Sequence, residues 1–156
     1  MGTRRQAREL AMQALFSMDM SASFSKQALA DYCQSFLQDK GGDSFFSRLV
    51  NGVLDHKDAL DNVVERYSSN WKMRRMACVD RNVLRLAVFE LLYCPDIPAK
   101  VSINEAIDIG KKFGSTESGA FINGILDSVR MAMDNRQLLP VDLPSNPDPT
   151  EALIND

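Results

Sequence analysis

Three arginines lie within five positions near the start of the chain, and guanidinium groups at this spacing are suited to binding phosphate. Arg4 and Arg8 are four residues apart and Arg5 and Arg8 are three apart, so on a helix all three can share one face. We expect this face to be solvated, because the apolar residues of the segment follow helical spacing on the opposite side. Guanidinium groups bind phosphate bidentately. The cluster therefore predicts a phosphate-binding site, with an ordinary solvated first turn as the alternative.

No catalytic or metal-binding set accompanies these arginines in the sequence. His56 is the only histidine, so no Ser/His/Asp or Cys/His arrangement can be built without it, and we interpret it as a helix-surface residue. Cys33, Cys78 and Cys94 are odd in number and far apart, which indicates neither a disulfide framework nor a zinc site and fits a reducing compartment. A glycine-rich phosphate loop is also missing from the sequence. We therefore expect no cofactor, no metal and no enzymatic activity.

The elements that must position the arginines are all predicted to be helices. The 156 residues are 45% apolar and 25% charged, as is ordinary for a globular protein, and the apolar residues repeat at helical spacing. The sequence predicts an all-α fold of six or seven helices with short connections. No apolar run approaches the roughly 18 residues of a membrane span, and no signal peptide is expected. We therefore expect a cytoplasmic protein that does not contact a membrane.

Polar residues ahead of apolar runs predict where the helices begin. A capping box from Thr3 to Gln6 predicts the start of the first helix, and Ser25 and Asp43 are predicted to cap the second and third. The third helix is expected to be long, with loosening near residues 55–57. The remaining predictions are an N-cap at Asp80, a capping box from Ser102 to Glu105, a left-handed residue at Gly114 and a last helix over about 116–133.

A break at residues 68–71 predicts a division of the helical domain, residues 1–134, into two lobes, about 1–68 and 71–134. The basic residues that follow the break, Lys72, Arg74 and Arg75, are interpreted as a solvated turn. Residues 135–156 are proline-rich and acidic and are predicted to be disordered. Residues 136–156 carry one basic and four acidic residues, so the net charge of −3 belongs to the tail. Positive charge in the folded part is therefore a matter of local distribution.

Three short blocks of the sequence stand in a specific order and separation. They are residues 4–10 (Arg-Arg-Gln-Ala-Arg-Glu-Leu), residues 103–114 with Ile-Asn-Glu-Ala-Ile and Lys-Lys-Phe-Gly, and residues 121–127 (Phe-Ile-Asn-Gly-Ile-Leu-Asp). In identity, order and separation they resemble the NusB family of bacterial transcription antitermination factors, over about residues 3–133. The resemblance implies an all-helical protein that binds the boxA element of ribosomal RNA operon transcripts. It implies binding together with NusE, a small-subunit ribosomal protein, and indirect contact with other Nus factors and RNA polymerase.

The resemblance also implies roles for particular residues. The RNA-binding positions that match the family are Arg4, Arg5, Arg8, Lys111, Lys112, Glu117 and Phe121, and the positions toward NusE are Phe16 and Asp80. Phe121 can stack on a splayed base, although helical spacing alone places it in the core. Gly119 and Ala120 replace basic residues common in the family, which removes positive charge from the expected RNA edge.

Three other functions stay open from the sequence. A NusB-like domain also resembles the N-terminal, RNA-targeting part of ribosomal RNA cytosine methyltransferases, but no cofactor-binding glycine pattern is present. A protein-interaction adaptor is the second alternative, and it includes a homodimer formed through apolar helix faces. A DNA-reading helix-turn-helix is weaker, because no short helix–Gly–helix unit carries a polar recognition face.

Overall fold

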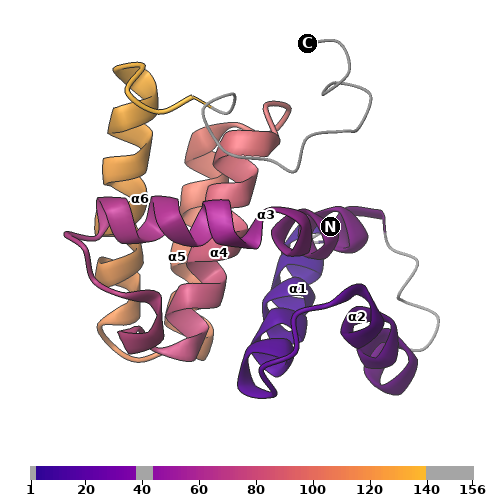
Figure 1. Cartoon of the computed structure of the whole chain (residues 1–156). Coiled ribbons are helices and arrows are strands. Elements are labelled where there is room, and N and C mark those ends of the chain that lie inside the picture. The colour runs from indigo at the N-terminus through magenta and orange to yellow at the C-terminus, as the bar shows by residue number, and fades with distance from the viewer. Residues whose placement is uncertain (1–2, 38–43, 140–156) are drawn as a thin grey trace, which may run out of the picture.

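The computed structural model describes residues 3–37 and 44–139, and these residues form helices without any strand (Figure 1). In chain order the elements are α1 (Thr3–Met20), α2 (Lys26–Tyr32), the π-helical turn η1 (Cys33–Leu37), α3 (Ser44–Tyr67), the 3₁₀ turn η3 (Met73–Arg75), α4 (Cys78–Tyr93), α5 (Ala99–Phe113) and α6 (Ser118–Asp134). The all-α prediction with six or seven helices is confirmed. The predicted cap at Asp43 and residues 140–156 of the tail lie outside the described residues.

The second helix begins where its sequence predicts. Ser25 has an extended backbone, and its hydroxyl oxygen accepts a hydrogen bond from the Ala28 N–H at 3.0 Å. This bond satisfies one of the N–H groups that a helix start leaves unpaired. α1 likewise begins at Thr3, the first residue of its predicted capping box.

Two predicted starts in the second half of the chain are wrong. α4 begins at Cys78, so Asp80 lies inside its first turn and does not cap it. α5 begins at Ala99, directly after Pro98, whose φ of −59° and ψ of 137° lead the chain into the helix. Ser102 therefore lies within α5 rather than at its cap. Proline lacks an N–H and is tolerated where a helix begins, so it starts the helix ahead of the Ser/Glu signal.

Gly114 ends α5, but not in the predicted left-handed conformation. Its φ is −100° and its ψ is −155°, which is extended backbone. A Cβ atom at this position would overlap the hydroxyl of Ser118, the first residue of α6. The same hydroxyl accepts a hydrogen bond from the Ser115 N–H at 2.9 Å. Glycine therefore allows the close turn between α5 and α6, and the last helix starts two residues later than predicted.

The loosening expected within α3 is present at His56. Its φ of −122° and ψ of 18° interrupt the helix. The sequence predicted the His56 imidazole at the surface. Instead it is partly buried and stacks on Tyr93 of α4, with ring centroids 4.2 Å apart. The surface interpretation was wrong because the imidazole packs against aromatic side chains of α4, a contact that the local sequence does not show.

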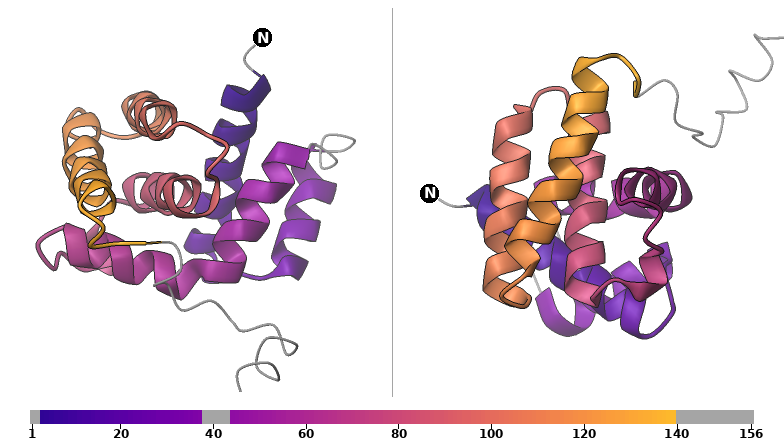
Figure 2. Two further views of the ribbon diagram at one scale, coloured as in Figure 1. Left: turned by 90° about the horizontal axis from the view of Figure 1, so that it is seen from above. Right: turned by 90° about the vertical axis from the view of Figure 1, so that its left-hand side faces the viewer.

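α4 is the central helix of the fold. It packs against α1, α3, α5 and α6, and Figure 2 shows these four helices around it. Its residues from Asn82 to Leu92 are all buried, and one hydrophobic core includes side chains from every helix of residues 3–37 and 44–139. None of these helices combines the length and apolar character that crossing a membrane requires.

Candidate nucleic-acid interface

Arg8 is buried against α4, in contrast to the solvated position that the sequence predicted. Its Nε lies 2.9 Å from Oε2 of Glu90 and its Nη2 lies 2.8 Å from Oε1. The Ser102 hydroxyl donates to the same carboxylate at 2.8 Å. The reason is helical geometry: Arg8 stands three and seven residues before Ala11 and Leu15, which form the buried face of α1. The guanidinium of Arg8 is therefore fixed in an ion pair with good geometry inside the protein.

Arg5 lies at the same end of α1 but stays accessible. Its Nε is 2.8 Å from Glu105 and its Nη2 is 3.1 Å from Asp108, both on α5. About half of the Arg5 side chain, 52%, is exposed. Ion pairs at this exposure contribute little to stability, so this guanidinium can exchange a carboxylate for an incoming phosphate at small cost.

Arg4 is exposed, and it makes no ion pair within the described part of the chain. Its guanidinium carbon lies 4.5 Å from the centroid of the Phe45 ring. Such a contact orients a cation without neutralising it. Of the three predicted arginines, Arg4 therefore keeps its charge most available to a ligand.

A cleft of about 530 Å³ brings the three arginines together. It is lined by Thr3, Arg4, Arg5, Arg8, Ile97, Pro98, Val101 and Glu105. The start of α1 forms one side, and the chain entering α5 forms the other. The predicted arginine cluster thus borders a real cleft, which has a cationic wall and an apolar wall.

The other predicted RNA-binding residues lie along α5 and the start of α6. Lys112 is exposed and pairs with Glu9 of α1 at 2.9 Å. Lys111 is exposed, and its aliphatic carbons lie close to Gly119, within 2.9 to 3.6 Å of the position that a Cβ atom there would take. Glu117 is exposed just before α6. These contacts join α1, α5 and the start of α6 into one surface.

Phe121 lies at the rim of the core. Its side chain is partly buried against the hydrophobic core, and its ring meets the exposed ring of Trp71 edge to face, with centroids 6.4 Å apart. The Phe121 ring is therefore partly in the core and partly exposed, and its contact with RNA stays a prediction. Sequence reasoning missed the partnership, since fifty residues separate the two rings and no local signal links them.

The two positions predicted to face a protein partner have different surroundings. Phe16 is partly buried on α1 and packs against the core. Asp80 is buried, and its Oδ1 has no hydrogen-bond partner among the residues that the structure describes. A buried carboxylate oxygen without a donor is costly, so a donor from a bound partner would stabilise it.

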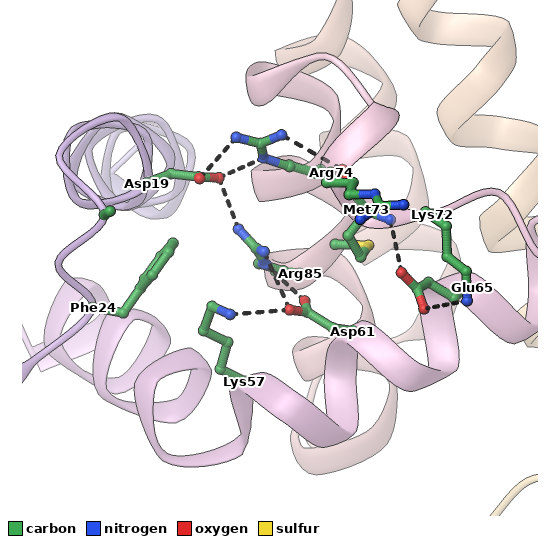
Figure 3. Close-up of a pocket in the computed structure, with 11 residues that line it drawn as sticks. Asp19, Phe24, Lys57, Asp61, Glu65, Lys72, Met73, Arg74 and Arg85 are labelled. Carbon is green, nitrogen blue, oxygen red and sulfur yellow. Dashed lines mark hydrogen bonds and ion pairs between the residues drawn. The ribbon is translucent and has the colours of Figure 1, made fainter.

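A second and larger pocket, of about 660 Å³, lies between α1, α3 and α4 (Figure 3). Arg85 reaches from α4 between Asp61, at 2.7 Å, and Asp19, at 2.9 Å, while Arg81 holds Asp19 at 2.6 Å. Sequence reasoning missed this network. Two arginines four residues apart on a helix predicted to be buried were the signal that could have found it. Because carboxylates neutralise both guanidiniums, the network ties three helices together instead of offering a phosphate site.

The network also changes the acidity of Asp19. Burial by itself would raise the pKa of this carboxyl, but hydrogen bonds from Arg81 and Asn82 and the positive charges of Arg85 and Arg81 outweigh burial and lower the pKa to about 2. The ionised form is therefore favoured by its surroundings. Across residues 3–37 and 44–139, no group of three or more His, Cys, Asp or Glu side chains could hold a metal ion.

A central buried helix wrapped by four others, with a cationic cleft at the start of the first helix, defines an all-α protein with a candidate phosphate-binding surface. Comparison with known proteins identifies the class more closely: residues 5–131 match the model of the NusB family. The transcription antitermination protein NusB of Desulfatibacillum aliphaticivorans is 50% identical over 137 residues, which are 88% of this chain and 96% of that protein. This chain belongs to the NusB family.

Solved structures agree with the family assignment. The T. maritima NusB structure is 34% identical and has a TM-score of 0.70, covering 86% of this chain and 97% of that one. A crystal structure of the antitermination factors NusB and NusE in complex with dsRNA has a TM-score of 0.72 at 24% identity, over 85% of this chain and 98% of that one. The second likeness shows the fold alone.

Proposed function

We propose that this chain is a transcription antitermination factor that binds boxA RNA of ribosomal RNA operon transcripts together with NusE. Membership of the NusB family supports this proposal. In it the protein acts in the cytoplasm as an adaptor without catalysing a reaction, and it reaches RNA polymerase through other Nus factors. The structurally related complex contains NusB, NusE and RNA, so the proposed partners match those of a protein with the same fold.

The observation that carries the proposal is the cationic cleft at the start of α1. Arg4 and Arg5 line it with accessible guanidinium groups. Guanidinium binds phosphate bidentately and stacks on bases, and single-stranded RNA offers both groups at once. Arg8 lines the same cleft from a buried position. Its direct contact with RNA stays a prediction, and its pairing with Glu90 indicates a second role, which is to hold α1 against α4.

The remaining predicted residues extend the proposed RNA surface away from the cleft. Lys111 and Lys112 add exposed positive charge on α5, and Phe121 offers a ring edge for stacking. Glu117 is exposed at the same end and can accept a hydrogen bond from a base amino group. For NusE we propose contacts at Phe16 and at Asp80. The buried Oδ1 of Asp80 has no hydrogen-bond partner among the described residues, and a donor from NusE would satisfy it.

The proposal is tested by titrating a fluorescent boxA RNA, and a scrambled RNA of the same length and composition, with this chain in the presence and absence of NusE. We expect the chain and NusE together to bind the boxA RNA more tightly than the scrambled one. Equal affinity for the two RNAs with NusE present, or no binding at all, would remove the proposal.

Replacing Arg5 with alanine tests the cleft itself. We expect R5A to weaken binding to boxA and scrambled RNA alike and to reduce the slope of log affinity against log salt by roughly one unit, because one phosphate contact is lost. K26A is the matched control, since Lys26 is also about half exposed and ion-paired, at 3.0 Å to Asp55, but stands on α2. A slope unchanged in R5A would show that Arg5 does not contact the RNA backbone.

A further inference from the structure

Trp71 is the only tryptophan of the chain, and the fold holds it at the surface. The residue is 53% exposed. Ser69 and Asn70, just before it, have φ values of 57° and 63°, a left-handed conformation that non-glycine residues adopt at a cost. The Trp71 N–H donates to the Ser68 carbonyl at 3.1 Å, and the Ser68 hydroxyl donates to the Trp71 carbonyl at 3.1 Å. A strained but hydrogen-bonded turn therefore presents a large ring to solvent.

Positive charge follows this ring along the chain. Lys72, Arg74 and Arg75 are all exposed. Lys72 approaches Glu65 only to 3.8 Å, and the two arginines make no ion pair within the described residues. The Glu65 carboxylate instead accepts the Met73 N–H at 2.8 Å (Figure 3), which fixes the η3 turn. Residues 71–75 thus combine a hydrogen-bonded backbone, an exposed ring and two guanidiniums without an ion pair among the described residues. One of these guanidiniums, that of Arg74, also lines the second pocket (Figure 3).

Trp71 lies at one end of the surface that α1, α5 and the start of α6 form, which is the surface proposed to bind RNA. Contacts run from Arg5 to α5, from Glu9 on α1 to Lys112, and from the Lys111 side chain to the start of α6. They end where the Phe121 ring meets Trp71. The η3 turn therefore borders the far end of the proposed RNA surface.

We propose that Trp71, supported by Phe121, is a stacking site for a base of single-stranded RNA, and that the cations of the η3 turn hold the phosphates beside that base. This inference rests on the proposed function and extends the RNA path beyond the residues that the family resemblance implies. An exposed ring flanked by cations is the combination that single-stranded nucleic acid requires, because every base has a face to stack and a phosphate to neutralise. The Phe121 ring contacts the indole edge to face, and about half of Trp71 stays exposed.

Tryptophan fluorescence tests this site directly, since Trp71 is the only tryptophan of the chain. The chain, alone and with NusE, is titrated with the boxA RNA, and the signal of the W71F variant under the same conditions is subtracted. We expect quenching that saturates with the binding curve. In anisotropy titrations with NusE we expect W71A to bind about 5- to 100-fold more weakly, while W71F, which keeps a ring, stays within about threefold of wild type.

F36A is the matched control, because Phe36 is also strongly exposed, at 69%, but lies in η1 beside Tyr32. We expect F36A to bind RNA like wild type, and circular dichroism to show that both alanine variants are folded. Unchanged affinity in W71A, with loss of binding in R5A, would overturn the stacking site and leave the proposed function standing. If the Trp71 fluorescence changed with NusE alone, and not with RNA, Trp71 would contact the protein partner. That result would also overturn the proposed stacking site. Absence of any RNA binding by wild type would remove both proposals.

Discussion

Arg5 and Arg8 stand three residues apart on α1, yet water reaches only one of them. Arg5 bridges Glu105 and Asp108 with half of its side chain exposed, whereas Arg8 pairs with Glu90 at 5% and 2% side-chain exposure. Exchange of a carboxylate for a phosphate is cheap at the first position. At the second it would leave Glu90 charged and buried without a partner, which is strongly unfavourable.

The two arginines therefore predict different mutant behaviour. We expect R8A to lower the free energy of unfolding by about 3–5 kcal/mol, because a buried charge loses its partner. R5A should change the free energy of unfolding by less than about 1 kcal/mol, because exposed ion pairs contribute little. Urea unfolding of both variants and wild type measures the difference. An R8A variant as stable as R5A would contradict the burial of this ion pair.

Asp19 predicts a pH dependence. Its folded pKa of about 2 lies below the ordinary value of 3.8, so its ion pairs stabilise the fold above about pH 4, and that contribution is lost as the pH falls toward 2. The difference corresponds to about 2 kcal/mol. D19N should therefore be less stable than wild type at pH 7 by about that amount or more, and the gap should narrow at pH 3. Urea unfolding at the two pH values tests this, and a gap independent of pH would count against the network.

At the scale of the elements, glycine decides how closely α3 and α4 approach. A Cβ at Gly52 would overlap the ring of Phe89 on α4. Gly52 is buried within α3, whereas Gly124 in α6 is exposed, with no atom within 4 Å of the position that a Cβ would take. Both glycines follow an asparagine within a helix, so the same dipeptide serves two different surroundings.

Replacing each glycine with alanine separates the two cases. We expect G52A to lose about 1–3 kcal/mol of unfolding free energy, because the added methyl forces Phe89 or the helix to move. G124A should gain up to about 1 kcal/mol, because alanine favours a helix more than glycine does. Thermal unfolding followed by circular dichroism at 222 nm, a general helix signal, reports both changes. A G52A variant that melts with or above wild type would show that the interface between α3 and α4 accommodates the methyl group.

At the scale of the whole molecule, charge is sorted by exposure. The most buried cations, Arg8 and Arg85, are neutralised by carboxylates, whereas Arg4, Lys111, Arg74 and Arg75 are exposed. The negative excess of the sequence lies in residues 136–156. A chain with a net charge of −3 therefore presents local positive potential on the surface proposed for RNA, and binding there should weaken as salt rises.

The sequence by itself determined the helical class, the start of α2, the bend near residue 56 and the cluster of arginines. Each of these depends on neighbours within a turn or two, through periodicity, a capping hydroxyl or a run of like charges. The identity, order and separation of three short motifs also indicated the family, which the comparisons confirmed. Two helix starts were misplaced. Pro98 begins α5 ahead of the signal at Ser102, and α4 begins at Cys78, two residues before Asp80.

Only the tertiary structure decided which charges are free. Arg8 is neutralised by a residue 82 positions away and Phe121 meets a ring fifty positions earlier, and no local pattern encodes such distances. Arg5 is thus exposed while Arg8 is buried, and Gly52 is buried while Gly124 is exposed, although each pair is alike in sequence. The physical reason is that burial and ion pairing depend on which helix packs opposite a residue, and that is fixed only when α4 is enclosed by its four neighbours.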